Sequence, residues 1–456
     1  MPRVTSKPGA VMAACVSAPM RRQAGAASLI VVMVLFFLMS LVAAYTSRNL
    51  IFEQRTSVNQ YRATQAYEAA EAGLEWALTM LNSGRIGADC LETGATTANT
   101  SFRQRYLAID ADTGVVTPRV GPTSGTPLWP SCVSDGAGGW ACNCPSDATP
   151  SLSAPSGSGV FPAFRVRFTA NDLSRPGLIR IESNGCTKLD DACLNHPASA
   201  QNFEGRANVA AIVALASALP TPPGAALTVL RDVPAGSILA LYNTDADLGG
   251  ITVQAGGTVD YAAWTLRSVP GTPGPASVAQ GEVSLNALTG APDRAFASVF
   301  SMWPATYRTQ PAAVVVDCPT ADCRPNLATA VAMNPDRVIW ATTADPTGTI
   351  TLASAGAVGS APGASVAGPA VIVFDRPVNV TIAGVSIFGF VHSRSGNWQG
   401  TNPVEVQGAA FIEGDLANTA RATVVMNSAV LKSLRLRSGS FVRAPGGWDD
   451  FRGRAP

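Results

Sequence analysis

Residues 25–47 read GAASLIVVMVLFFLMSLVAAYTS, and no residue from Gln23 to Ser47 carries a charge. As a helix, this uncharged run is about 37 Å long, which exceeds the roughly 30 Å hydrocarbon core of a bilayer. A secretory signal has a shorter apolar region, and its small residues follow that region, whereas here the small residues 24–27 precede it. The run therefore predicts a transmembrane helix over residues 26–47.

The charges around this run predict its orientation. Residues 1–25 contain Arg3, Lys7, Arg21 and Arg22 and no acid, and positively charged flanks stay on the cytoplasmic side. The rest of the chain is therefore expected in the periplasm or outside the cell. Without the leader, the formal net charge changes from +1 to −3, so no basic surface indicates a nucleic-acid partner.

The helix is expected to continue well beyond the membrane. Residues 48–84, RNLIFEQRTSVNQYRATQAYEAAEAGLEWALTMLNSG, contain no proline and no glycine before Gly73. Small and apolar residues recur every three or four positions from Ala66 to Leu81, which predicts an amphipathic helix. Gly84 is a typical C-terminal cap, so the predicted helix spans residues 26–83.

Residues 21–81, RRQAGAASLIVVMVLFFLMSLVAAYTSRNLIFEQRTSVNQYRATQAYEAAEAGLEWALTML, resemble the N-terminal domain of the PilX family of minor type IV pilins. The resemblance rests on a basic leader that ends in glycine, an apolar helix and a downstream AAEA segment. It implies that a prepilin peptidase removes the leader, residues 1–25, by cutting between Gly25 and Ala26. It also implies that these apolar residues pack first in the inner membrane and then among the helices of a pilus: Leu29, Ile30, Val34, Phe37, Leu38 and Leu41.

One position departs from the major pilins. They carry glutamate as the fifth residue of the mature chain, whereas this position is Ile30 here, as is usual in PilX-like domains and in the K-type pseudopilin of type II secretion. The departure favours a rare or terminal place in the filament over the main fibre subunit. Translation from Met1 or from Met20 is compatible with the pattern, because Met20 begins the short leader MRRQAG and would omit Cys15.

The cysteines that follow the predicted membrane helix are even in number and lie on the predicted external side, which predicts four disulfides. Zinc binding is disfavoured because the cysteine pair at residues 142 and 144 is too tightly spaced and no histidine lies nearby. Short separations favour the pairs Cys186–Cys193 and Cys318–Cys323, whereas Cys142 and Cys144 are each left to pair with Cys90 or Cys132.

Beyond the helix, the sequence predicts an α+β protein. Residues 84–219 are expected to form a pilin head, with a cystine-pinned loop followed by an antiparallel meander. Alternating apolar residues in FRVRFTAND and GLIRIESNGC predict two strands joined by a turn at Pro176-Gly177, and GRANVAAIVALASAL, from about Arg206 to Leu215, predicts a third.

Residues 220–456 are expected to form a second, β-rich domain. Many short β-branched runs separated by Gly, Asn, Asp and Ser favour a β-helix or solenoid over a β-sandwich. The helical segment APDRAFASVFSM is expected to cover a sheet end or to join two strand blocks, and Trp448 and Phe451 are expected to close an open β edge. The apolar centres Val371, Phe388, Phe411 and Val425 lie 17, 23 and 14 residues apart, so no clean repeat is predicted.

The sequence contains no recognisable catalytic motif, so neither an enzymatic activity nor a cofactor is predicted. The two histidines, His196 and His392, fall in different predicted domains, and neither a G-x-S-x-G nor a phosphate-binding loop is present. The strands offer scattered acids at Asp375, Glu405, Glu413 and Asp415, whose simplest interpretation is a solvated face. Trp398 is interpreted as partly buried over a solenoid edge, with surface contact as the alternative.

YNTDADLGG sets Asn243, Asp245 and Asp247 at alternate positions, a partial calcium-loop pattern that lacks the closing glutamate. A solvated turn is the favoured interpretation, and Ca²⁺ binding is the alternative.

Three functions follow from these observations. The favoured one is a minor pilin that assembles with other minor pilins and the major pilin at the inner-membrane pilus assembly platform. It would prime or cap the pilus and display its β-rich domain for adhesion to a surface or host ligand. The alternatives are a K-like tip pseudopilin of type II secretion and a membrane-anchored β-helix enzyme acting on polysaccharide, which would need clustered acids with Arg or Lys on one solenoid face.

Overall fold

The computed structural model describes most of the chain after residue 23. Contacts divide the chain into one unit that ends at Tyr61 and a second that begins at Arg62. Residues 1–23 of the leader, which include Cys15, and also His196 and Phe451 lie outside the described residues. The described residues are 24–94, 100–147, 151–157, 159–170, 175–194, 205–345, 348–365, 367–381, 384–394 and 397–450.

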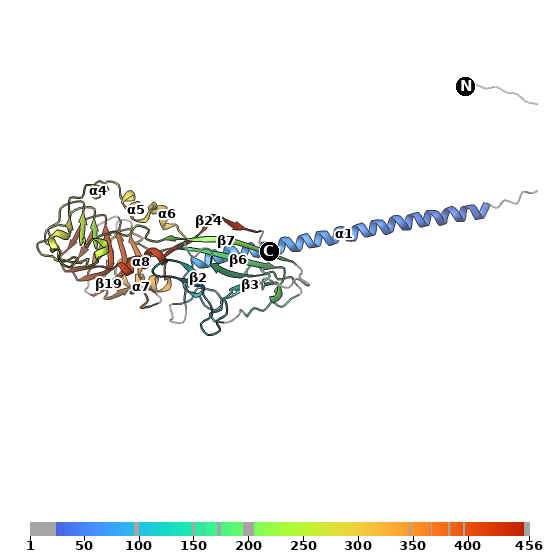
Figure 1. The fold of residues 1–456 in the computed structure, drawn as a ribbon, viewed down its shortest axis with the longest axis horizontal. Helices are drawn as coiled ribbons and strands as arrows, with labels where there is room; N and C mark the ends of the chain where they lie inside the picture. Colours follow the sequence, from blue (N-terminus) through green and yellow to red (C-terminus); the bar gives the residue numbers. More distant parts are fainter. Residues whose placement is uncertain are drawn as a thin grey trace, which may run out of the picture. The chain divides into compact units, whose positions relative to one another are not determined.

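Helix α1 (Ala24–Leu81) is continuous through 58 residues, as the absence of proline and the late glycine predict (Figure 1). It is long and apolar enough to cross a membrane, and its apolar window is not buried by the rest of the chain. The helix ends before the predicted cap, and Gly84 does not adopt a positive φ. Instead, the guanidinium of Arg103 donates to the carbonyl of Leu81 from Nε at 3.1 Å and Nη2 at 3.0 Å.

Arg103 also joins the helix end to two other segments. Its Nη2 donates to the carbonyl of Gly439 at 2.7 Å, and its Nη1 donates to the carbonyl of Arg437 at 3.2 Å. A cation at a helix C-terminus is favourable because the last carbonyls carry partial negative charge. Burial lowers the pKa of Arg103 to about 10, so the guanidinium remains charged at neutral pH.

The second part of α1 packs on an antiparallel sheet of the same unit, the head sheet. Among the described residues this sheet has six strands in the order β24-β7-β6-β5-β3-β4. The predicted meander is present as β5, β6 and β7, with the turn at Pro176-Gly177. The strands are β3 (Ser131–Ser134), β4 (Trp140–Asn143), β5 (Ala163–Ala170), β6 (Leu178–Cys186), β7 (Arg206–Ser217) and β24 (Gly439–Asp449).

Small residues allow α1 to approach this sheet closely. Ala66, Ala70 and Leu74 are buried in the contact. A Cβ added to Gly73 would lie 2.3 Å from Ser183 Oγ, and one added to Gly185 would lie 2.2 Å from the carbonyl oxygen of Ala66. The three-and-four spacing seen in the sequence is therefore the face that packs on the sheet.

Short elements border the head sheet and the C-terminal strands. They are α2 (Phe102–Tyr106), β1 (Leu107–Ile109), β2 (Val116–Pro118), α3 (Asp191–Leu194), η1 (Ala246–Leu248), η2 (Gly274–Ser277), α7 (Arg324–Met333) and α8 (Ser428–Arg437).

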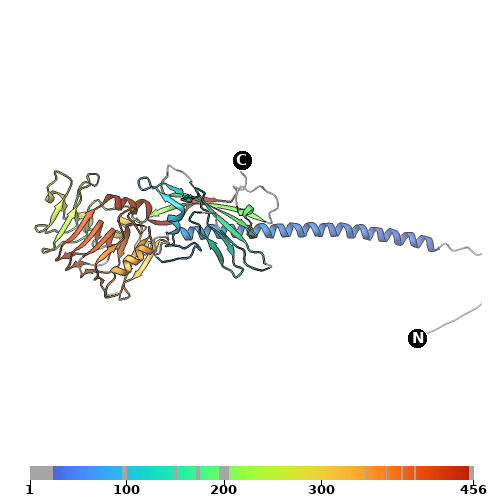
Figure 2. The same cartoon turned by 90° about the horizontal axis from the view of Figure 1, so that it is seen from below.

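The C-terminal part is a parallel β-solenoid built from two blocks of strands (Figure 2). The first block contains β8 (Leu227–Val229), β9 (Leu239–Tyr242), β10 (Val253–Ala255), β11 (Thr265–Arg267) and β12 (Val278–Ala279). The second contains β13 (Ala313–Asp317), β14 (Val338–Thr342), β15 (Ile350–Leu352), β16 (Gly356–Val358), β17 (Ala370–Phe374), β18 (Val378–Val380), β19 (Val385–Ser393), β20 (Trp398–Gly400), β21 (Val404–Ile412), β22 (Leu416–Asn418) and β23 (Ala422–Met426).

The coils of the second block differ in length, as the expectation of no clean repeat requires, because Ala313 pairs with Val338 and Val338 with Val371, which are steps of 25 and 33 residues. Within the block, the coils of β17, β19 and β21 do keep one length, because Ala370 pairs with Gly389 and Gly389 with Gly408, 19 residues apart each time. The apolar centres chosen from the sequence are not equivalent positions, because Val371 pairs with Phe390 rather than with Phe388. The uneven spacing of the apolar centres therefore reflects both different faces of the coil and coils of different length.

The two blocks meet through parallel strand pairs. β21 pairs with β8 and β23 pairs with β9, so the end of the second block lies on the start of the first. The chain between the blocks forms α4 (Val283–Asn286), α5 (Pro292–Phe300) and α6 (Pro304–Arg308). The predicted joining helix is α5, whose buried residues include Phe296 and Phe300.

The C-terminal segment differs from the expected solenoid cap. β24 leaves the solenoid and pairs antiparallel with β7, so residues 439–449 belong to the head sheet although the predicted boundary placed them in the second domain. The strand does close a β edge, but that edge belongs to the head sheet. Trp448 remains 46% exposed there.

Candidate functional site

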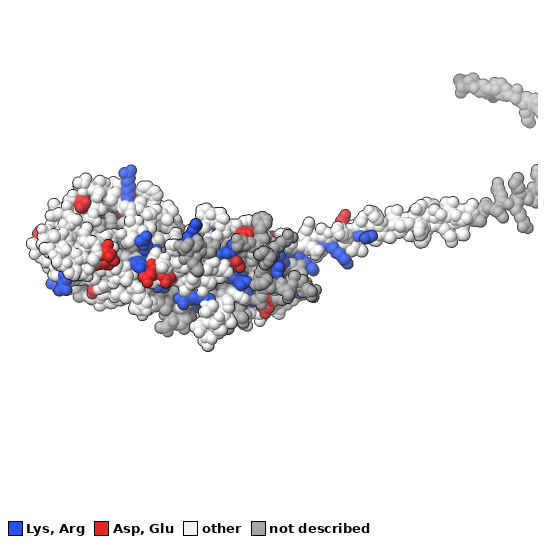
Figure 3. Space-filling view, in the orientation of Figure 1, with Lys and Arg blue, Asp and Glu red and all other residues white. Residues whose placement is uncertain are grey.

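The first part of α1 presents apolar side chains on every side. The residues expected to pack in membrane and filament are each between 51% and 66% exposed: Leu29, Ile30, Val34, Phe37, Leu38 and Leu41. Figure 3 shows this part of the helix free of charged side chains. A helix that is apolar all round is stable in lipid or among other apolar helices, so this surface indicates a membrane anchor.

The hydroxyl groups in this segment are satisfied within the helix. Ser40 Oγ donates to the carbonyl of Phe36 at 2.8 Å, and Thr46 Oγ1 donates to the carbonyl of Val42 at 3.0 Å. Unpaired polar groups are costly in hydrocarbon, so these internal hydrogen bonds make the segment compatible with lipid. Gly25 and Ala26 lie in the first turn of α1, but their side chains are outside the described part, and cleavage between them stays a prediction.

The exposed apolar surface extends beyond residue 47, which the sequence analysis did not identify. Leu50, Ile51, Phe52, Val58 and Tyr61 are between 47% and 71% exposed. Glu53 and Arg55 lie among them, so no uncharged run marks them. The signal that could have revealed them is the triplet LIF at residues 50–52, shortly after the predicted span. It places three large apolar residues on a helix that no other element of its own unit covers.

All eight cysteines after the leader form disulfides in the described part of the chain. The pairs are Cys90–Cys144, Cys132–Cys142, Cys186–Cys193 and Cys318–Cys323. The last two are the local pairs that short separation favoured. The first two resolve the alternatives left open for Cys142 and Cys144, because β3 and β4 are hairpin neighbours that place Cys132 opposite Cys142.

The predicted calcium residues lie in one turn and take part in local hydrogen bonds. Asn243 is buried, and its Nδ2 donates to the carbonyl of Ile251 at 2.8 Å. Asp245 caps the short helix η1 by accepting from the backbone N–H of Asp247 at 3.0 Å. Calcium binding at this turn stays a prediction.

Two of the acids that look scattered in the sequence, Asp375 and Glu413, form one ladder with Arg394. Asp375, Arg394 and Glu413 directly follow the last residues of β17, β19 and β21, whose ends pair in register. The 19-residue coil therefore stacks them in adjacent coils. Glu405 and Asp415 are outside the ladder. Trp398 is only 3% exposed, so it is buried more completely than the partial burial expected from the sequence.

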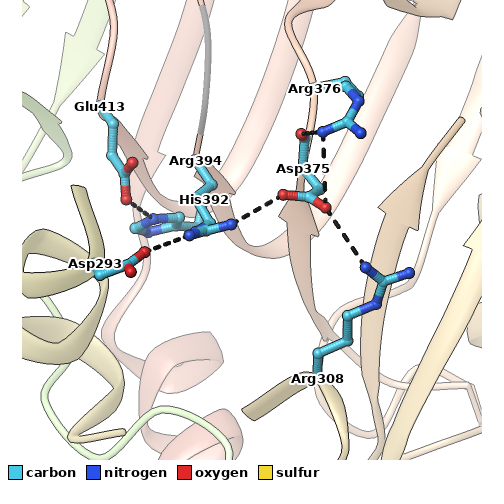
Figure 4. A network of polar contacts seen from close by, with 7 residues as sticks. All are labelled: Asp293, Arg308, Asp375, Arg376, His392, Arg394 and Glu413. Atoms are coloured by element: carbon cyan, nitrogen blue, oxygen red, sulfur yellow. Dashed lines mark hydrogen bonds and ion pairs between the residues drawn. The ribbon is translucent and has the colours of Figure 1, made fainter. Parts of the chain in front are cut away.

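Further ion pairs connect the ladder to Asp293, Arg308 and Arg376 (Figure 4). Arg394 Nη1 donates to Asp375 Oδ1 at 3.1 Å, and Nη2 donates to Asp293 Oδ1 from α5. Asp375 also lies 3.8 Å from Arg308 Nη1 and 3.9 Å from Arg376 Nη1. Because one carboxylate serves three guanidinium groups, the cluster retains an excess of positive charge.

Behind the ladder, a buried histidine meets Glu413. His392 stacks on Phe411 with ring centroids 4.9 Å apart, and its Nε2 lies 2.8 Å from Glu413 Oε1. Burial is the main cause that lowers the pKa of His392 to about 3 and raises the pKa of Glu413 to about 9. Both groups are therefore neutral at pH 7, and their contact is a hydrogen bond between neutral side chains rather than an ion pair.

Strongly shifted pKa values often accompany a functional site. In the described residues, however, no group of three or more His, Cys, Asp or Glu side chains is placed to hold a metal ion. The ladder combines charged ion pairs with the neutral carboxyl group of Glu413. It can therefore offer both charged and neutral hydrogen-bonding groups to a polar ligand.

Comparisons with known proteins address the N-terminal part. Residues 24–75 match the family model described as PilX N-terminal, which supports a type IV pilin-like role. No curated protein matches the chain. Among solved structures, the chain is similar to the competence-associated pilin ComZ from Thermus thermophilus with 11% identity, 85% of this chain and 97% of that chain covered, and a TM-score of 0.20. A TM-score this low carries no argument about the fold.

Proposed function

We propose that this chain is a minor pilin of the type IV pilus that takes part in pilus assembly. The observation that carries the proposal is helix α1. Its first part is apolar all round and exposed, its last part packs on an antiparallel sheet through small residues, and residues 24–75 match the PilX N-terminal model. Transfer of the exposed part from lipid into a bundle of similar helices keeps its side chains out of water, so assembly needs no bond-making residue.

A place in a priming or tip complex fits this chain better than a place in the repeating fibre. Ile30 offers no carboxylate for a neighbour's N-terminal amine. The partners of this proposal are the major pilin and other minor pilins at the inner membrane, with the second unit in the periplasm and later on the pilus. The β-solenoid would then be displayed outward as an adhesive part.

The experiment that tests this proposal is N-terminal sequencing of the mature chain from its host. We expect a start at Ala26, and we expect the variant Gly25→Val to accumulate with its leader attached. Gln23→Ala is the matched control in the leader and should be processed normally. A mature chain that starts at Met1 or Met20 would contradict the proposal.

A second measurement tests location. Sheared pili should contain the chain in low amount relative to the major pilin, and a strain without the chain should carry fewer pili. If the chain is abundant along the fibre, its role as a minor subunit is wrong. If it is found only in a type II secretion pseudopilus, the K-like alternative is correct.

A further inference from the structure

A cavity of about 320 Å³ lies at the end of the polar ladder, and we call it the ladder cavity. Its lining comes from both strand blocks and from the segment that joins them. The lining residues include Leu230, Arg231, Leu288, Thr289, Arg394 and Glu413. This volume is at the lower end of the range for small-molecule sites, which is about 300–1,000 Å³.

The cavity combines an apolar wall with hydrogen-bond donors. Leu230 and Leu288 supply apolar surface, and Arg231 and Arg394 carry guanidinium groups. The Thr289 hydroxyl donates to the carbonyl of Asn286, so its oxygen is left as an acceptor. An inorganic anion would leave the apolar wall without contact, and a purely apolar ligand would leave the exposed guanidinium of Arg231 without a partner. The lining therefore fits a ligand that has a negative group on a body with both hydroxyls and C–H surface.

The charge around the cavity favours an anion. Arg231 is exposed and forms no ion pair within the described part of the chain. Arg394 is held in place by Asp375 and Asp293, and Asp375 also serves two further arginines. Asp293 and Asp375 are therefore paired with other arginines, and the neighbouring Asp232 accepts hydrogen bonds from the N–H and the hydroxyl of Thr258.

A buried carboxyl group in the lining lacks a partner. The Glu413 side chain is only 4% exposed, and one of its oxygens contacts His392. The other oxygen, Oε2, has no hydrogen-bond partner among the described residues. A buried polar group left without a partner costs about 1–3 kcal/mol, so a ligand hydroxyl at this position would relieve the cost.

We infer that the ladder cavity binds a carboxylated sugar, a pyranose ring that carries one carboxylate. The carboxylate pairs with Arg231 at the exposed side, a ring hydroxyl meets Glu413 and Thr289, and the C–H face of the ring lies on Leu230 and Leu288. This inference deepens the adhesive part of the proposed function and rests on it for its biological meaning. The binding itself is a property of the solenoid.

The test uses the full-length chain in detergent and titrates it with D-glucuronate, D-glucose and inorganic phosphate by calorimetry. We expect D-glucuronate to bind at least about tenfold more tightly than either other probe, since one charge-assisted contact is worth roughly that factor. Arg231→Gln should weaken glucuronate binding by about tenfold or more. Arg421→Gln, an exposed arginine elsewhere on the solenoid, is the matched control and should bind as the unmodified chain does.

A second variant removes a negative charge and should change the affinity for glucuronate in the opposite direction. Asp293→Asn removes a negative charge from the ion-pair cluster beside the cavity, which repels the ligand carboxylate, so it should strengthen glucuronate binding. Absence of glucuronate binding at about 10 mM would overturn the inference, and so would equal affinity for phosphate or glucose. A chain that is trimmed at Ala26 but binds no sugar refutes this inference alone, whereas an untrimmed chain that binds glucuronate refutes the proposed pilin function alone.

Discussion

At the scale of single residues, two glycines decide how the solenoid turns its corners. Gly389 and Gly408 are central in β19 and β21 and adopt φ values of 148° and 147°, which L side chains rarely adopt. A Cβ on Gly408 would lie 2.0 Å from the carbonyl oxygen of Gly389 in the next coil. Each long strand therefore passes from one face of the coil to the next at a position that only glycine fits.

Gly408→Ala should therefore destabilise the second unit. Backbone strain and overpacking each cost about 1–3 kcal/mol, so we expect a loss of roughly 2–5 kcal/mol. The measurement is the urea midpoint of the full-length chain in detergent. Gly224→Ala adds the same methyl group where no atom lies within 4 Å, and it should leave the midpoint nearly unchanged. Equal midpoints for both variants would refute the proposed corner constraint.

The pair of His392 and Glu413 makes stability depend on pH in a defined direction. The folded pKa of Glu413 is raised to about 9, so between about pH 4.5 and pH 9 the unfolded chain loses this proton while the folded chain keeps it. The contribution of Glu413 to stability therefore falls as pH rises through this window. The pKa of His392 is lowered to about 3, so its contribution falls as pH drops below about 6.5.

Glu413→Gln removes the ionisation but keeps a neutral side chain of similar shape. The stability of this variant relative to the unmodified chain should rise with pH between 5 and 9, by at most about 1.4 kcal/mol per pH unit. Urea midpoints at several pH values measure the slope. Glu405→Gln removes a carboxyl group from the same strand and serves as the control. A relative stability that does not change with pH would show that Glu413 ionises in the folded chain.

At the scale of elements, the close packing of α1 on the head sheet gives a direct test. Gly73→Val should destabilise the second unit by about 1–3 kcal/mol, because its side chain would overlap Ser183 and Phe164. Ala63→Val adds a β-branched side chain at an exposed helix position and controls for helix propensity. Thermal unfolding followed by circular dichroism compares them. If both variants unfold at the same temperature, the close approach at Gly73 is not needed for stability.

The elements that could be predicted from the sequence are those with a local signal. The length of α1 follows from an uncharged run and a three-and-four pattern, and β5 and β6 follow from strict alternation of side chains. The 19-residue coil was missed because equivalent positions lie on strands that turn a corner at Gly389 and Gly408. VSIFGFVHS and VEVQGAAFI start 19 residues apart, and this similarity could have revealed the repeat.

The ladder and the position of β24 depend on contacts between distant parts of the chain. Asp375 and Arg394 are one coil apart, but Asp293 reaches them from a helix of another segment. The return of β24 to β7 depends on an edge that forms only after the head sheet has folded. A local pattern carries neither kind of information, so these features could not be predicted from sequence.

At the scale of the whole molecule, the two units differ in what stabilises them. The second unit has its own apolar cores and disulfides, whereas the exposed apolar surface of the first needs lipid or other helices. A charge placed in the apolar run should therefore affect membrane retention and assembly without affecting the folded second unit.

Val34→Arg tests this separation. Arginine near the centre of a membrane helix costs about 2.5–3.5 kcal/mol on insertion scales, so less of the variant should remain in the membrane fraction, and it should be absent from sheared pili. Thermal unfolding of the second unit should be unchanged. Val58→Arg places the same charge beyond the predicted span and should stay in the membrane fraction. A helix buried in lipid or among apolar neighbours cannot take up this charge without a cost in free energy. If Val34→Arg is retained in the membrane and enters pili as the unmodified chain does, the apolar run is therefore neither the anchor nor the packing surface.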